Sequence, residues 1–141
     1  MNIQHIVDRY HTAVDEFSRG NPMPVKMILS HQDDVSLANP FGPPVSGWSK
    51  VSEALDFASS RFKDGEVISF DTIAKYESSE LVTILEIEKW KAKVGGREDV
   101  SLFSLRVTST FRNEDGNWNL VHRHADPITT FNSDGPLRGA S

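Results

Sequence analysis

The stretch Val100–Asp126, "VSLFSLRVTSTFRNEDGNWNLVHRHAD", decides the fold because it contains two consecutive strands and the turn between them. From Phe103 to Arg112 apolar and polar residues alternate, which is typical of a strand with one buried face and one polar face. The letters "EDGN" are a hairpin-turn signal, and "WNLVHRHAD" predicts the returning final strand. The stretch therefore predicts a long antiparallel hairpin.

The segments before this hairpin predict two more long strands and, earlier, three helices. Apolar residues recur at helical spacing in residues 2–19 and 51–62, and Pro24 begins a shorter helix between them. The predicted order is helix 2–19, helix 24–30, short strand 33–40, helix 51–62, and long strands 67–77, 81–94, 100–113 and 118–126.

This order predicts an α+β fold in which three N-terminal helices cover one face of a curved antiparallel sheet of four long strands plus a short one. A long bent sheet with a helix across its concave side forms a cone with a pocket inside. We expect a single domain over residues 1–130. Residues 131–141 have no core-forming pattern and predict a mobile C-terminal tail.

Composition excludes several classes of function. The chain of 141 residues carries a net charge of −5 and no cysteine. A negatively charged protein is not expected to bind nucleic acid or an acidic membrane through its overall charge. Without cysteine, the chain has no disulfides and no thiolate catalysis. No apolar run is long enough to span a membrane, and the opening "MNIQHIVDRY" lacks a secretory pattern, so we expect a cytoplasmic protein. No glycine-rich nucleotide loop follows a strand, so no cofactor is expected.

The element order, together with "FRNEDGNWNLVHRHAD", resembles the SnoaL-like, ketosteroid isomerase-like branch of the nuclear transport factor 2-like superfamily. A basic residue after an aromatic, a turn with glycine, a tryptophan and then "VHxH" occur in several members, including the association domain of calcium/calmodulin-dependent kinase. The resemblance covers roughly Ile3 to Thr130. It implies a cone-shaped, cystatin-like α+β domain and a homodimer that packs sheet on sheet. It does not fix the function, because this fold carries many unrelated activities.

Comparison with ketosteroid isomerase, an enzyme that depends on tuned carboxyl groups, gives three changed positions. Asn39 stands where the isomerase has its general base, and an amide does not take up a proton at neutral pH. Ala13 matches the oxyanion-hole tyrosine, with Tyr10 about one turn away, and Ser109 matches the second oxyanion donor. The resemblance therefore implies that standard steroid isomerase chemistry is absent and that Ser109 faces the pocket.

The last strand contains the most conspicuous polar row, His122, His124 and Asp126, which share a face if the strand is regular. His124 with Asp126 is the predicted catalytic pair, because a carboxylate fixes a histidine's tautomer and raises its pKa. All three could instead bind a metal, but a straight row of three spans about 13 Å, too far for one ion. We therefore predict no metal site. The sequence leaves open whether this face or that of Val121, Arg123 and Ala125 is internal.

Five further residues are predicted to contact a ligand. Glu86 and Glu88 share a face of their strand with Trp90, and the sequence does not decide whether that face is internal. The rigid loop "NPFGPPVSGW" is expected to close the mouth of the cone. The predicted ligand-binding residues are Asn39, Phe41, Trp48, Glu88 and Ser109.

These residues favour a small-molecule-binding protein, and the resemblance implies that it is a homodimer. The resemblance implies that it acts as a cofactor-independent isomerase, cyclase or dehydratase on an apolar or carbonyl-containing metabolite. Two alternatives remain at this point. One is a non-catalytic dimerisation or ligand-binding module, and the other is a metal-dependent enzyme centred on His122, His124 and Asp126.

Overall fold

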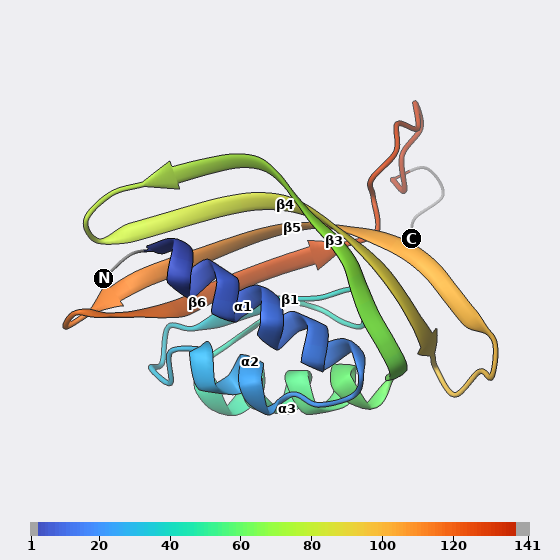
Figure 1. The fold of residues 1–141 in the computed structure, drawn as a ribbon, viewed down its shortest axis with the longest axis horizontal. Coiled ribbons are helices and arrows are strands. Elements are labelled where there is room, and N and C mark those ends of the chain that lie inside the picture. Colours follow the sequence, from blue (N-terminus) through green and yellow to red (C-terminus); the bar gives the residue numbers. More distant parts are fainter. Residues whose placement is uncertain (1–2, 138–141) are drawn as a thin grey trace.

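The computed structural model describes residues 3–137 and contains three helices before a long antiparallel meander (Figure 1). The helices and the order of the strands agree with the sequence prediction. The elements are α1 (Ile3–Ser18), α2 (Met23–Ile28), β1 (Ser36–Ala38), β2 (Val45–Ser46), α3 (Trp48–Ser60), β3 (Phe62–Glu77), β4 (Leu81–Val94), β5 (Val100–Glu114) and β6 (Asn117–Asp126).

The strands form one curved sheet in the order β2-β1-β6-β5-β4-β3. The long strands pair antiparallel with their sequence neighbours, as predicted, whereas β1 runs parallel to β6. Two features were not predicted. The proline-rich loop contains the two-residue strand β2, and β3 begins at Phe62 rather than at Val67.

The early start of β3 depends on an irregular step beside the end of α1. Asp64 has a positive φ of 53°, and the pairing with β4 shifts between Lys63 and Glu66. Gly65 lies in this step, and a Cβ added there would overlap the carbonyl oxygen of Ser18. Glycine therefore allows the strand to pass directly against the helix end.

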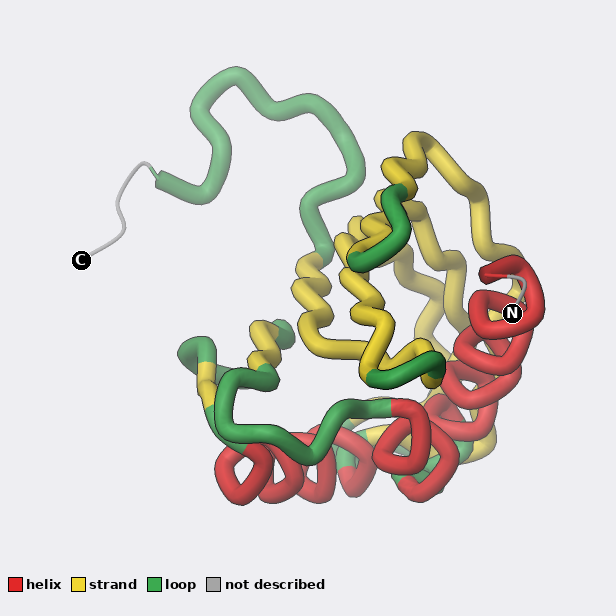
Figure 2. Tube along the Cα trace, turned by 90° about the vertical axis from the view of Figure 1, so that its left-hand side faces the viewer, coloured by secondary structure: helices red, strands yellow, loops and turns green. Residues whose placement is uncertain are grey.

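The helices lie together along the concave side of the sheet, and the C-terminal segment extends away from it (Figure 2). Helix α1 buries Tyr10, Val14 and other apolar residues against the inner face of β4 and β5. The Tyr10 ring meets Phe111 edge to face, with 5.3 Å between ring centroids. Helix α1 therefore covers the inner, concave face of the sheet.

The C-terminal segment after β6 contains no helix or strand as far as residue 137. The predicted tail spans residues 131–141, of which 138–141 lie outside the described residues. Among the described residues, no helix has the length and apolar character needed to cross a membrane.

Candidate functional site: an apolar cavity with a buried arginine

A cavity of about 440 Å³ opens between the helices and one end of the sheet's inner face. This volume lies within the range of about 300–1,000 Å³ typical of small-molecule sites. Asn39, Ser101 and Arg123 are its polar lining residues among those described, and the rest are apolar or aromatic. Most of the apolar wall is formed by Val14, Phe17, Leu37, Phe41, Leu55, Ala58, Phe62, Trp90, Phe103, Leu105 and Ala125.

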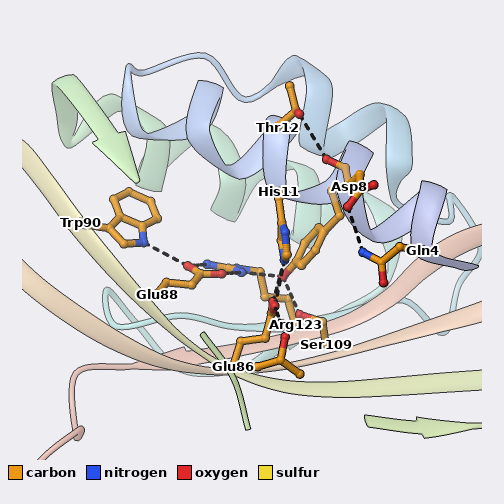
Figure 3. Close-up of polar contacts among 11 residues, drawn as sticks. Gln4, Asp8, His11, Thr12, Glu86, Glu88, Trp90, Ser109 and Arg123 are labelled. Atoms are coloured by element: carbon orange, nitrogen blue, oxygen red, sulfur yellow. Dashed lines mark hydrogen bonds and ion pairs between the residues drawn. The ribbon is translucent and has the colours of Figure 1, made fainter. Parts of the chain in front are cut away.

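Arg123 enters the cavity wall from β6 and is held by Glu88 of β4 (Figure 3). Its Nη1 and Nη2 groups each donate to one oxygen of the carboxylate, at 2.8 Å and 2.8 Å. The Glu88 side chain is 0% exposed and that of Arg123 is 10% exposed. The indole Nε1 of Trp90 also donates to Glu88 at 3.0 Å. A buried carboxylate is stabilised by a bidentate arginine and by an additional hydrogen-bond donor, and Glu88 has both.

Tyr10 of α1 extends this network to β5. Its hydroxyl accepts from Nη1 of Arg123 at 2.5 Å and shares a hydrogen bond with the Ser109 hydroxyl at 2.5 Å. Burial raises the pKa of Tyr10 to about 12, although the positive charge of Arg123 opposes this rise. Burial also acts to lower the pKa of Arg123, but the charge of Glu88, the influence of Tyr10 and the hydrogen bonds to both together outweigh it and raise that pKa. Tyr10 is therefore neutral and Arg123 charged at neutral pH.

A second buried carboxylate lies on the same face of β4. The Nε2 atom of His11 lies 3.0 Å and 2.9 Å from the two oxygens of Glu86, whose side chain is 1% exposed. The His11 ring stacks on Phe70 with 3.9 Å between centroids. Neither His11 nor Glu86 lines the cavity, so this pair connects α1 to the sheet beside the site rather than within it.

The predicted catalytic residues His124 and Asp126 lie on the outer face of the sheet, away from the cavity. The His124 side chain is 54% exposed and lies 3.5 Å from Asp126. Asp126 accepts from Nε of Arg106 at 2.7 Å. Burial acts to raise the pKa of Asp126, but the hydrogen bonds from Arg106 and the backbone N–H of Ile128 outweigh it, and the pKa is lowered. Of the two faces that the sequence leaves open, the one that lines the cavity is therefore that of Arg123 and Ala125.

A β-bulge in β6 explains this placement. Near the turn Phe111 pairs with Leu120, but the next pair is Thr110 with His122, so Val121 has no partner. A one-residue shift moves every later side chain to the opposite face of its strand. Without the bulge, His122 would lie opposite the inward-facing Ser109. With it, Arg123 takes that position.

The other predicted residues have three different placements. Asn39 and Phe41 line the cavity, and their contact with a ligand stays a prediction. Glu88 and Ser109 are both 0% exposed and lie behind the wall, where they bind Arg123 and Tyr10. Trp48 does not line the cavity, because its ring stacks on His31 with 3.7 Å between centroids.

Sequence reasoning missed Arg123, Trp90 and His11 as members of buried networks. One signal was available for Arg123, which is the single charged residue on the otherwise apolar face it shares with Val121 and Ala125. Its ion pair with Glu88 joins residues 35 positions apart in the sequence and forms only when their strands pair. No local sequence pattern indicates such a partner.

The three candidate metal ligands of β6 do not converge. The ring centroids of His122 and His124 are 6.5 Å apart, and the Nδ1 atom of His122 is hydrogen-bonded to the Ser36 hydroxyl at 2.8 Å. Within residues 3–137, no group of three or more histidine, aspartate or glutamate side chains is arranged to hold a metal ion.

Comparisons with known proteins agree with this architecture. The chain is similar to a nuclear transport factor 2-like superfamily protein from Salmonella enterica, with 16% identity, a TM-score of 0.78, and 94% of this chain and 93% of that chain covered. It is similar to a ketosteroid isomerase-like protein from Erwinia carotovora, with 16% identity, a TM-score of 0.74 and coverage of 91% and 95%. It is also similar to a provisionally assigned dehydratase of the nuclear transport factor 2-like family from Streptomyces avermitilis. Here the identity is 18%, the TM-score is 0.70, and 89% of this chain and 96% of that chain are covered.

These identities show a shared fold and do not transfer an activity. The comparison with curated proteins gave no match. A family model described as "SnoaL-like domain" matches residues 3–129, which is most of the chain. The chain therefore belongs to the SnoaL-like domain family.

Proposed function

We propose that this protein binds a small, largely apolar molecule in the cavity between its helices and sheet. The observation that carries the proposal is the cavity itself, which is about 440 Å³ in volume and has an aromatic and aliphatic wall with few polar groups. Such a composition favours ligands that bind mainly by removing apolar surface from water. The proposed ligand contacts are Asn39 and Phe41 from the loop and Arg123 from the sheet. Glu88 and Ser109 lie behind the cavity wall, where Glu88 holds Arg123 and Ser109 bonds to Tyr10.

Binding is better supported than proton-transfer catalysis. Members of this family often act as isomerases or dehydratases. Such chemistry needs a group that accepts a proton near the ligand. The polar lining residues of the described cavity are an amide, a hydroxyl and a guanidinium, and none of these is a ready base. A catalytic role for His124 and Asp126 stays a prediction that their place on the outer face does not favour.

The test is a titration with prodan, a fluorescent naphthyl ketone whose emission moves to shorter wavelength in apolar surroundings. We expect saturable binding to the wild-type protein. Ala125 is buried in the cavity wall, so Ala125→Leu places extra methyl groups in the binding space and is expected to weaken binding about tenfold or more.

The matched control is Ala74→Leu, which makes the same change on the outer face, since Ala74 pairs with the outward-facing Leu85. It should bind prodan as the wild type does. Absence of saturable binding in the wild type, or equal binding by Ala125→Leu, would overturn the proposal.

We also infer a cytoplasmic homodimer that packs through the outer face of β4 and β5. This face carries half-buried apolar and threonine side chains, and Thr83 and Thr110 share a hydrogen bond across it at 2.9 Å. A face with such apolar and threonine side chains suits contact with a second copy.

A further inference from the structure

Arg123 is a buried cation at the end of an apolar cavity. It is the single charged side chain among the described residues that line this space. Its guanidinium lies against the Glu88 carboxylate, which also accepts from Trp90, and both Arg123 and Trp90 line the cavity (Figure 3). A charged group in such a place needs either a structural explanation or a ligand that uses it.

Structural contacts account for only part of its hydrogen-bonding capacity. An arginine has five N–H donors. Among the described residues, three of those of Arg123 are used, two by Glu88 and one by Tyr10. The Nε–H and one Nη2–H remain. Arg123 lines the cavity, and no fully buried side-chain nitrogen or oxygen in the described chain lacks a partner, so its Nε is not sealed in the interior.

The charge of this site is already balanced. Glu88 neutralises Arg123 through two hydrogen bonds, and Tyr10 stays protonated. A carboxylate ligand would therefore add an unbalanced negative charge to an apolar cavity, close to the Glu88 carboxylate. Such a charge is costly at low dielectric.

We propose that Arg123 is a ligand-binding residue that makes the cavity selective for molecules with a neutral carbonyl group, such as apolar ketones, esters or amides. The inference rests on the proposed binding function and narrows it to one chemical class. The remaining N–H groups of Arg123 donate to the carbonyl oxygen, and the aromatic wall holds the apolar body of the ligand.

A carbonyl fits better than a hydroxyl for a reason of hydrogen-bond balance. A carbonyl oxygen only accepts, which matches a guanidinium that only donates. A hydroxyl brings its own proton, and the acceptors nearest to Arg123, which belong to Glu88 and Tyr10, are already engaged. The hydroxyl proton would need Asn39 or Ser101, the other polar lining residues, as its acceptor, whereas a carbonyl needs none.

The experiment compares three probes that share a ring system on the wild-type protein. They are prodan, dimethylaminonaphthalene without the carbonyl, and the corresponding naphthoate. Because the compound without the carbonyl leaves water most readily, a purely apolar cavity would bind it best. We expect prodan to bind about tenfold more tightly than this compound, as a hydrogen bond from a charged donor allows, and more tightly than the naphthoate.

Two variants then assign the selectivity to Arg123. In Glu88→Gln the positive charge of Arg123 is unbalanced, and we expect the naphthoate to gain about tenfold relative to prodan. The double variant Arg123→Met with Glu88→Met removes both charges together and avoids leaving one of them buried alone. It should bind prodan no more tightly than the compound without the carbonyl.

The control is Arg106→Met. Arg106 also pairs with a carboxylate, that of Asp126, but on the outer face of the sheet. This variant should keep the wild-type preference.

Each outcome separates the inference from the proposed function. If the three probes bind the wild type with equal affinity, or the carbonyl-free compound binds best, the cavity binds ligands but the inference is wrong. Retention of the ketone preference by the double variant would also overturn it. If no probe binds, the proposed function and the inference both fail.

Discussion

At the scale of single residues, the pair formed by Arg123 and Glu88 connects stability to the site. Each charge is buried, and each has the other as its main compensation. Removing one partner leaves an uncompensated charge in a poorly polar interior, which costs more than removing both.

We therefore expect Arg123→Met to lower the free energy of unfolding by about 3–5 kcal/mol. The double variant with Glu88→Met should recover most of that loss, because no unpaired charge remains. Urea unfolding followed by circular dichroism measures both values. Equal destabilisation by the single and double variants would contradict the coupling between these side chains.

His122 gives a second prediction at this scale. Burial, with a smaller effect of the neighbouring His124, lowers the pKa of its imidazole below the ordinary value. The unfolded chain then binds the proton more readily than the folded one. The stability contributed by neutral His122 is present above the ordinary histidine pKa of about 6.5 and is lost as the pH falls below it.

Proton NMR of the imidazole signals measures this pKa directly. We expect His122 to titrate below the ordinary histidine value and His122→Gln to flatten the dependence of unfolding free energy on pH in that window. A midpoint at or above the ordinary value would refute the prediction.

At the scale of elements, the contact between the end of α1 and the start of β3 controls how the helix lies on the sheet. Gly65→Ala would drive a methyl group into the backbone carbonyl of Ser18, and neither this carbonyl nor a Cβ fixed by its own backbone can turn aside. We expect it to lower the free energy of unfolding by about 1–3 kcal/mol.

The control for this change is Gly42→Ala, because an added Cβ there meets nothing within 4 Å. Thermal unfolding of the two variants should differ clearly, with Gly42→Ala within about 0.5 kcal/mol of the wild type. Similar stability of both variants would show that the helix moves away at little cost.

The elements also show what sequence can and cannot predict. The meander of β3 to β6 was predictable because each strand carries its own alternating pattern and each turn its own signal. The inner face of β6 was not, because a bulge at Val121 is a property of two paired strands. The two-residue strand β2 likewise exists only through its pairing with β1.

The candidate site was predictable to the same extent. Asn39 and Phe41 belong to a loop whose position follows from the family resemblance, and they do line the cavity. Arg123 and Glu88 come within hydrogen-bond distance only when β4, β5 and β6 pair in the observed register. Their partnership is therefore a product of tertiary structure.

At the scale of the whole molecule, the proposed homodimer is open to direct test. We expect sedimentation equilibrium to give twice the chain mass. Leu85→Arg, in the middle of the outer face, should shift the mass toward the monomer because it buries an unpaired charge between copies. Met27→Arg is the control, because Met27 is 71% exposed on helix α2, on the opposite side of the sheet from this face. A monomeric wild type would overturn the inferred interface.

The hydrogen bond between Tyr10 and Arg123 has a consequence for how the chain is made. It joins the first helix to the last strand across 113 positions of sequence. Contacts of such separation form late in folding, since the loop they close must be ordered first. A chain still emerging from the ribosome already contains the aromatic residues that line the cavity. It does not yet contain β6, the strand that completes the cavity wall. Binding competence thus arises only when synthesis has passed β6, and a fragment that ends before Asn117 would have neither the cavity nor its arginine.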